Sequence, residues 1–437
     1  MWLSANSVNC RMEGNTIGKT GKKVSMKGKS ANYVVFDIGS NKVAAMAANI
    51  NKTGESTIIA QVLQYSGGFK ASTVVNLEAA ENSIIAAIYS LEKECNKSIN
   101  EVTISLSSGF KSYYINHTLK LGSQPINKQD IKKLIQKALA DFSLKDQEVI
   151  HYFPIEFTLD KDKVVDNPNG MYARELSCQI HVITANSLML KNLTNCFARC
   201  HIEVGDIVLS IYADGLASLS DEEKETGSII INMGSHISSF GVFFEGKVLY
   251  VGSVPIGSHH ITSDIAKCLS ISMHTAEKLK ILYGDVRPEL FNKDESIRIG
   301  DFEPENSYNV NLTIPVSKLA EIIRPRVEEI LVLLKKEYDN IGMDHLIAKR
   351  IVLTGGGSGL QGMKNLVAEI FHKQVRIVKL ENVPTFAENV NNVAIYSTAI
   401  GMIKSKALKY KKNSFKSGEQ EELGWAKKIF LWFKENV

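Results

Sequence analysis

Three short turns in this chain carry glycine directly after an apolar stretch, and turns of this kind can bind phosphate. They are Asp37-Ile-Gly-Ser-Asn-Lys42, Asn232-Met-Gly-Ser-His236 and Gly355-Gly-Gly-Ser358. Glycine lets backbone N–H groups approach an anion because no Cβ stands in the way. Two such turns facing each other could clamp a chain of phosphates, and the third could lie against a nucleoside. One glycine turn after a strand is usually only a turn, but three in this order predict a nucleotide cleft.

The strands that must position these turns follow one plan, and the plan occurs twice. Three strands with two intervening turns are expected first at 33–37, 43–50 and 58–65, and again at 228–232, 239–244 and 248–254. Asn232 in the second copy corresponds to Asp37 in the first, 195 residues earlier. Helical patterns follow at 77–94, 262–269, 275–283 and 363–371, the last after a strand near residue 351. This alternation predicts a duplicated α/β fold.

Composition and charge narrow the classes of protein. Of 437 residues, 44% are hydrophobic and 22% charged, as in a globular protein with several cores. No apolar run approaches the roughly 20 residues that a membrane-spanning helix needs. The formal charge is +4, but residues 1–30 and 404–437 each carry +5 and the body carries −6. Two basic tails on an acidic body predict a polyanionic partner.

The last fourteen residues, 424–437, indicate which polyanion this is. Four large apolar residues fall on one helical face, at Trp425, Ile429, Trp432 and Phe433, with Lys427 and Lys428 mostly on the other side. The segment is too short to span a bilayer, and Trp and Phe beside Lys are typical of a helix lying among lipid headgroups. A terminal helix docked on the body is the alternative. Because no basic and aromatic groove occurs elsewhere, we expect anionic phospholipid and no nucleic acid.

The order of the three turns resembles the actin-like ATPase superfamily, and further segments resemble its FtsA family of bacterial division proteins. Residues 37–43 resemble the first phosphate loop, 261–266 and 276–280 resemble segments after the second, 351–362 resemble the adenosine loop, and 396–401 resemble the helix that closes the first half. The resemblance covers residues 33–437. It implies a duplicated actin-like (ribonuclease H-like) α/β fold, with two halves around a nucleotide cleft and an inserted subdomain 1C in the first half.

On this resemblance the chain divides into several parts. We expect a mobile basic arm at 1–32, a first half (1A) at 33–110 completed by 196–226 and 377–403, subdomain 1C at 111–195, a second half (2A) at 227–286 and 341–376, subdomain 2B at 287–340, a polar linker at 404–423 and an amphipathic membrane-targeting helix at 424–437.

The resemblance also implies ATP and Mg²⁺ as cofactors. The expected nucleotide-binding residues are Asp37, Gly39, Ser40, Asn41, Lys42, Gly234, Ser235, His236, Glu277, Lys280, Gly355, Gly356, Gly357 and Ser358. Asp37 would hold Mg²⁺ through water, and Lys42 would supply a cation to the phosphates. Glu277 and Lys280 match positions that the family uses toward the ribose and adenine, and the alternative is an ordinary solvated ion pair.

The second phosphate loop departs from the superfamily pattern Asp-x-Gly-Gly-Gly-Thr. Asn232 replaces the acidic residue, Ser235 and His236 replace two glycines, and Ile237 replaces the threonine. His236 could donate to a phosphate, but erosion of the site is the favoured interpretation. Because metal placement provides much of the electrostatic stabilisation in phosphoryl transfer, we expect hydrolysis to be slow or absent.

The resemblance implies an adaptor of cell division, peripheral at the cytoplasmic side of the inner membrane. Such a protein would bind ATP, self-associate in filaments or oligomers, hold the FtsZ ring at the membrane and recruit later division proteins. Arg326 matches an arginine that meets the C-terminal peptide of FtsZ, or it could simply be paired within its own helix. The alternative function is an active sugar-kinase-like enzyme on the same superfold, but no matching base motif is found. A chaperone-like ATPase would need a peptide-binding domain, and only about 35 residues follow Gly401.

Overall fold

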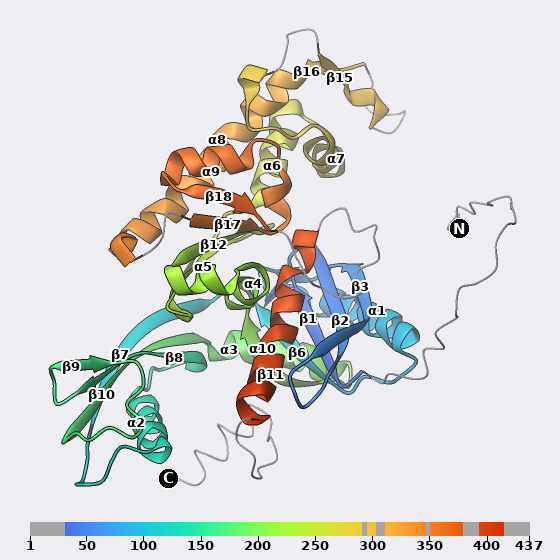
Figure 1. Cartoon of the computed structure of the whole chain (residues 1–437). Helices are drawn as coiled ribbons and strands as arrows, with labels where there is room; N and C mark the ends of the chain where they lie inside the picture. Colours follow the sequence, from blue (N-terminus) through green and yellow to red (C-terminus); the bar gives the residue numbers. More distant parts are fainter. Residues whose placement is uncertain (1–30, 291–294, 303–310, 347–349, 379–392, 415–437) are drawn as a thin grey trace, which may run out of the picture.

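Two five-stranded sheets of the same topology form the centre of the computed structural model, which describes residues 31–290, 295–302, 311–346, 350–378 and 393–414 (Figure 1). The first sheet has the order β11-β6-β1-β2-β3, and the second has the order β18-β17-β12-β13-β14. In both, the first strand pairs antiparallel with the second and parallel with the fourth. The predicted duplication is therefore confirmed.

The strands of the first sheet are β1 (Tyr33–Ile38), β2 (Lys42–Ile50), β3 (Ser56–Tyr65), β6 (Glu101–Leu106) and β11 (Glu203–Leu209). Those of the second are β12 (Ser228–Met233), β13 (Ser238–Phe244), β14 (Lys247–Val254), β17 (Arg350–Thr354) and β18 (Gln374–Ile377). The short pair β4 (Phe69–Lys70) and β5 (Thr73–Val74) follows β3.

Strand β2 shows why the first sheet is apolar along its whole length. Its small residues are buried on both faces: Ala45 and Ala47 belong to the core under α1 (Leu77–Cys95) and α3 (Ser187–Arg199), whereas Ala44 and Ala48 belong to the core under α10 (Ser397–Ser414). A strand covered on both sides loses the polar alternation of a half-exposed strand.

The two halves are joined where helix α10 meets α4 (Ser210–Ser218). Figure 1 shows α10 running along the first sheet with α4 beside it, between the two halves. A Cβ at position 401 would overlap the carbonyl oxygen of Ala213, and one at position 215 would overlap the ring of Phe243. Glycine at 401 and 215 therefore allows these helices to approach the neighbouring backbone and core closely.

An antiparallel sheet of order β7-β10-β8-β9 extends from the first half, with α2 (Lys128–Asp141) packed on one face. Its strands are β7 (Phe110–Lys120), β8 (Gln147–Leu159), β9 (Lys163–Val165) and β10 (Glu175–Asn186). The inserted sheet ends at Asn186, so the predicted insertion 111–195 extends too far: α3 contributes Leu190, Leu193 and Phe197 to the first-half core.

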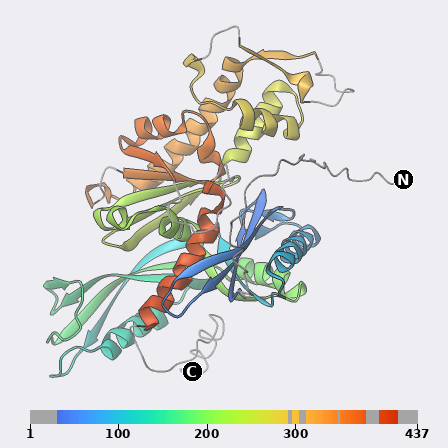
Figure 2. The ribbon, with the colours of Figure 1, turned by 45° about the vertical axis from the view of Figure 1, so that its right-hand side comes forward.

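The second sheet carries helices at the opposite end of the molecule (Figures 1 and 2). They are α6 (Ser258–Leu269), α7 (Met273–Tyr283), α8 (Val316–Asp339) and α9 (Met363–Phe371), together with the hairpin of β15 (Ser296–Arg298) and β16 (Thr313–Pro315). Although α8 lies inside the predicted subdomain 2B, its buried face shares one core with the second sheet, including the edge-on ring contact of Tyr338 with Phe240.

The predicted polar linker 404–423 begins too early. Helix α10 continues to Ser414, because Ile403 and Ala407 are buried against the first sheet and the Lys409 ammonium lies 2.8 Å from the carboxylate of Asp206 on β11. Apolar contacts that are distant in sequence override the lysine-rich composition here. The predicted arm 1–32 and the membrane-targeting helix 424–437 lie, apart from residues 31 and 32, outside the described residues.

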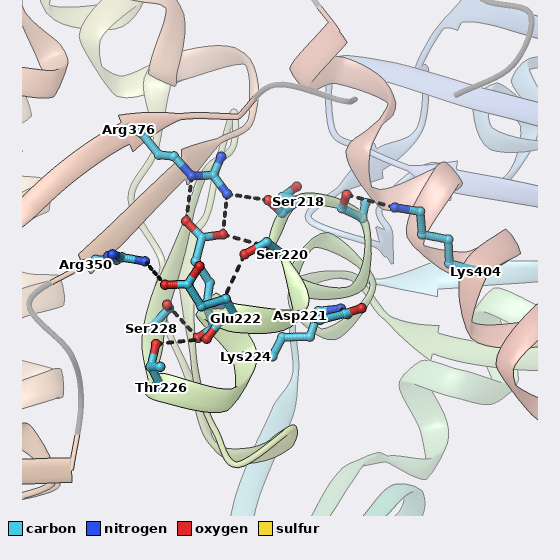
Figure 3. Close-up of polar contacts among 12 residues, drawn as sticks. Ser218, Ser220, Asp221, Glu222, Lys224, Thr226, Ser228, Arg350, Arg376 and Lys404 are labelled. Carbon is cyan, nitrogen blue, oxygen red and sulfur yellow. Dashed lines mark hydrogen bonds and ion pairs between the residues drawn. The ribbon is translucent and has the colours of Figure 1, made fainter. Parts of the chain in front are cut away.

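The short helix α5 (Asp221–Thr226), which leads from α4 into the second sheet, is fixed by a polar network (Figure 3). Arg376 on β18 donates two hydrogen bonds to the Glu223 carboxylate, at 2.7 and 2.5 Å, and a third to the carbonyl of Ser218 at 2.7 Å. Figure 3 also shows Arg350 of β17, which donates to the Glu222 carboxylate at 3.3 Å, and Lys404 of α10, which donates to the Ala217 carbonyl at 3.1 Å. This network joins the connection between the halves to both of them.

We expect Arg376→Ala to lower the free energy of unfolding by about 1–3 kcal/mol, because it leaves the buried Glu223 carboxylate without its cation. Arg350→Ala is the matched control: its partner Glu222 is 70% exposed, and we expect a loss below about 1 kcal/mol. Urea unfolding measures both variants.

The pH dependence of this effect provides a second test. Burial favours the protonated form of Glu223, but the stronger combined effect of Arg376 and the Ser220 N–H holds the pKa of Glu223 below its usual value. The contribution of the pair is therefore present above about pH 4.5 and is lost as the pH falls further. Equal losses in the free energy of unfolding for Arg376→Ala and Arg350→Ala at neutral pH would contradict the role given to the Arg376–Glu223 pair.

Candidate functional site

The first glycine turn closes tightly at the end of β1. The N–H of Gly39 donates to the carbonyl of Lys42 at 3.0 Å, and a Cβ at position 39 would lie 2.7 Å from that same oxygen. The Ser40 hydroxyl accepts a hydrogen bond from the N–H of Ala71 at 2.7 Å, whereas Asn41 and Lys42 are exposed. The turn therefore presents backbone and one lysine at the rim of the first sheet.

Asp37 lies just before this turn, where its carboxylate accepts a hydrogen bond from the Ser105 hydroxyl at 2.7 Å. Burial raises the pKa of Asp37 to about 7, the Ser105 bond opposes the rise, and the nearby carboxylate of Asp214 adds to it. Asp37 therefore carries only part of its charge near neutral pH, and a cation placed beside it would restore the rest.

The second turn is bound to the start of α6. The N–H of Ser258 donates to the carbonyl of Gly234 at 2.9 Å, and the N–H of His259 donates to the carbonyl of Ser235 at 2.8 Å. The His236 ring stacks on the His259 ring, with ring centres 4.3 Å apart. Replacing glycine by His236 therefore adds an aromatic contact to the loop instead of leaving open backbone.

The third turn packs directly against the second. Gly355 has φ +83°, and a Cβ there would overlap the side-chain oxygen of Asn232. Gly356 is exposed, whereas Ser358 is buried and its hydroxyl donates to the carbonyl of Gly355 at 2.7 Å. The Ser358 side chain stabilises its own loop, so only the backbone of this turn is open to a ligand.

Lys280 and Glu277 of α7 form an ion pair at 2.7 Å. The Lys280 ammonium also donates to the hydroxyl of Thr262 at 2.8 Å and to the carbonyl of Ser258 at 3.2 Å, and the side chain is only 9% exposed. Burial lowers the pKa of Lys280, while Glu277 opposes that shift. With three partners, this lysine positions the first turn of α6 at the loop, and Glu277 is the more accessible of the two.

Asp214 is a central residue that the sequence patterns did not reveal. It is fully buried on α4, where one carboxylate oxygen accepts from the Asn232 amide at 2.5 Å and the other accepts from the hydroxyls of Ser397 and Thr398 at 2.7 and 2.9 Å. Burial raises the pKa of Asp214, and these three donors oppose the rise. The available signal was a lone carboxylate within the apolar stretch 207–219.

The carboxylates partly fit a magnesium ion. Magnesium usually keeps several waters and binds through one or two carboxylates and the substrate phosphates. Asp37 suits that role, whereas Asp214 has protein donors on both of its oxygens. In the part of the chain that the structure describes, no group of three or more His, Cys, Asp and Glu side chains could hold a metal ion by itself.

Arg326 lies on α8, away from the glycine turns, and it is already paired. Its guanidinium donates to both carboxylate oxygens of Asp264 on α6, at 2.6 and 3.2 Å, and also contacts Glu329. The arginine is 27% exposed, so any incoming carboxylate would share it with these two residues. The predicted membrane residues Trp425, Lys427, Lys428, Ile429, Trp432 and Phe433 lie outside the described residues. Among the described helices, none has the length and apolar character to cross a membrane.

Comparison with known proteins agrees with this architecture. A family model described as "Cell division protein FtsA" matches residues 229–401, and one described as "SHS2 domain inserted in FTSA" matches residues 108–184. The chain is 32% identical over 380 residues to "Cell division protein FtsA" of Rhizobium meliloti (strain 1021), covering 84% of this chain and 86% of that protein. It is 26% identical over 422 residues to the protein of the same name from Escherichia coli (strain K12), covering 92% and 97%.

Two solved structures show the same fold at low sequence identity. The "PilM-PilN type IV pilus biogenesis complex" matches with a TM-score of 0.60 at 15% identity, over 87% of this chain and 98% of that one. MreB 5 of Spiroplasma citri bound to AMPPNP matches with a TM-score of 0.51 at 14% identity, over 89% and 100%. The predicted actin-like fold is thereby confirmed.

We expect Asp214→Ala to lower the free energy of unfolding by about 2–4 kcal/mol, because buried donors on two elements lose their acceptor. The milder variant Asp214→Asn removes the negative charge, so the pKa of Asp37 should fall below about 7. Carbon-13 NMR of labelled aspartate carboxyl groups measures that pKa. An unchanged titration of Asp37 in Asp214→Asn would show that the two carboxylates are not coupled.

Proposed function

The chain belongs to the FtsA family of cell-division proteins, and we propose that it is the adaptor that holds the FtsZ ring at the cytoplasmic face of the inner membrane. It binds ATP in the cleft, self-associates through actin-like contacts and recruits later division proteins. The observation that carries the nucleotide proposal is that matching strands of two sheets each end in a glycine turn, with the third turn packed on the second.

The residues of the cleft support binding of ATP with little hydrolysis. Backbone N–H groups of the first turn and the exposed Lys42 can meet phosphate oxygens. Asp37 would hold Mg²⁺ through water, and the ion would neutralise charge on the phosphates. Asn232 supplies no carboxylate, and Asp214 next to it has both oxygens bonded within the protein. Neither residue is therefore available as a base to orient an attacking water.

Attachment to the membrane is assigned to residues 424–437. Four large side chains partly buried in the interface contribute roughly 1–2 kcal/mol each, and the lysines add about 1 kcal/mol each at anionic lipid. Ordering the segment into a helix opposes much of this. One helix should therefore bind reversibly, and a self-associated array should bind tightly because each further contact is intramolecular.

We expect Trp432→Glu to move the protein, and FtsZ with it, from the liposome pellet to the supernatant in co-sedimentation with vesicles of anionic phospholipid. The partition coefficient should fall at least about tenfold, because a charge replaces an apolar anchor. The control Trp2→Glu changes a tryptophan of the other basic tail and should leave binding unchanged. If Trp432→Glu still sediments with liposomes, residues 424–437 are not the anchor.

The FtsZ peptide is proposed to dock on subdomain 2B near Arg326, where a guanidinium suits a peptide with carboxylates. Because Asp264 and Glu329 already share this arginine, we expect Arg326→Ala to weaken binding of the C-terminal FtsZ peptide only about threefold to tenfold. Arg298→Ala in the same subdomain is the control, since that side chain is 60% exposed and 3.9 Å from its partner Asp301. Fluorescence anisotropy measures both, and equal affinities would remove Arg326 from the docking site.

A further inference from the structure

Three histidines gather at the second glycine turn. The His236 and His259 rings are stacked at 20° with their centres 4.3 Å apart, and the His260 ring stands edge-on to both, at 6.1 and 6.3 Å. All three side chains are partly exposed. The cluster therefore combines a fixed geometry with access from solution.

The backbone holds this cluster in place. Hydrogen bonds from the N–H groups of Ser258 and His259 tie α6 to the turn, and the His260 Nδ1 accepts from the N–H of Gly257 at 3.1 Å. The same Nδ1 lies 3.3 Å from the carbonyl oxygen of Gly257, so this residue fixes the His260 ring. The stacked pair has near-parallel planes, so the in-plane nitrogens of its two rings do not converge on one point. That arrangement suits separate hydrogen bonds to different oxygens of a phosphate group better than ligation of one metal ion.

The charged groups around the cluster come from both halves. Lys70 of β4, on the first half, acts electrostatically on both His236 and His259, and Lys280 and Glu277 of α7 act on His259. Burial lowers the pKa of His236 to about 4, and His259, Lys70 and His260 add to the effect. Burial also lowers the pKa of His259, with Glu277 opposing. The stacked pair is therefore uncharged at neutral pH while no anion is present.

We propose that His236 and His259, together with Lys70, bind the terminal phosphate of the nucleotide and take up a proton when it arrives. The inference rests on the proposed nucleotide binding. It adds that these side chains replace the glycine and threonine donors that the second phosphate loop lacks. A neutral imidazole offers one N–H, whereas an imidazolium offers two and makes charge-assisted hydrogen bonds to phosphate. Lys70 belongs to the opposite half, so a phosphate bound by all three residues would draw the two halves together.

The sign of the pH dependence follows from linkage. A bound phosphate raises the pKa of the imidazoles toward or above the usual value of about 6.5. The complex then holds more protons than the free protein, so affinity increases as the pH falls from about 7.5 toward 5.5. Above about pH 8 the complex is also unprotonated and the coupling disappears.

Isothermal titration calorimetry with Mg-ATP, ADP and AMP tests the proposal at pH 6.0 and 7.5, in buffers of different ionisation enthalpy. The proteins are the full chain, His236→Gln, His259→Gln and the control His117→Gln in the inserted domain. We expect the full chain and the control to take up roughly half a proton more than the two cleft variants on binding ATP at pH 6.0. Between pH 7.5 and 6.0, the ATP affinity of the full chain and of the control should rise about threefold to tenfold more than the ATP affinity of the two cleft variants. Asp37 and the nucleotide also titrate, but they are common to all four proteins and cancel in the difference.

AMP separates loss of phosphate contacts from damage to the pocket, because it lacks the terminal phosphates. Unchanged AMP affinity with weaker ATP affinity in both cleft variants supports the proposal. Equal proton uptake and equal pH dependence in all four proteins would overturn it and leave the proposed nucleotide binding intact, whereas absence of ATP binding by the full chain would overturn both. If a cleft variant also loses AMP binding, the variant Lys70→Gln provides the test. We expect Lys70→Gln to bind ATP more weakly and AMP with unchanged affinity. An unchanged preference of Lys70→Gln for ATP over AMP would reject the proposal.

Discussion

The buried carboxylate of Asp214 is the interaction on which the relative position of the two halves depends. A carboxylate that water cannot reach must be compensated by donors from the protein, or several kcal/mol of stability are lost. Here the donors come from Asn232 on a strand of the second half and from Ser397 and Thr398 at the start of α10, which packs on the first half. Moving the second half away would remove the Asn232 donor from that carboxylate.

The buried carboxylate of Asp214 also helps to position the glycine turns. The Asn232 amide donates to Asp214, and its oxygen lies so close to Gly355 that no side chain fits there, so the second and third turns are positioned together. The carboxylate of Asp214 also acts on Asp37 at the first turn, where it contributes to the raised pKa of Asp37. An amide at 232 costs the site a carboxylate, but it supplies the donor that Asp214 needs. The departure that the sequence suggests to be erosion is therefore also part of the connection between the halves.

The second half carries the proposed FtsZ surface and also contacts the inserted sheet. The inserted sheet docks on the edge strand β14, where the Ser112 hydroxyl donates to the carbonyl of Val251 at 2.9 Å and His181 Nδ1 lies 2.9 Å from the carbonyl of Val248. Helix α8, which carries Arg326, shares the core of the same sheet. A phosphate held between Lys70 and the histidine pair would link nucleotide binding to the angle between the halves. That link gives a physical route from the cleft to the proposed self-association.

The sequence by itself determined the repeated strand–turn plan, because apolar runs ending in glycine turns are local patterns that the tertiary structure had only to assemble. The helices expected at 77–94 and 363–371 follow from apolar periodicity in the same way, and they correspond to α1 and α9. Strands β6, β11 and β18 and helix α4 were not predicted, since these short elements are stabilised mainly by neighbours distant in the chain. Only the tertiary structure decided that Asp214 accepts hydrogen bonds from Asn232 and from the start of α10, that Lys280 is buried behind the site and that three histidines meet at the second turn. Each of these arrangements depends on residues that are brought together across long sequence separations.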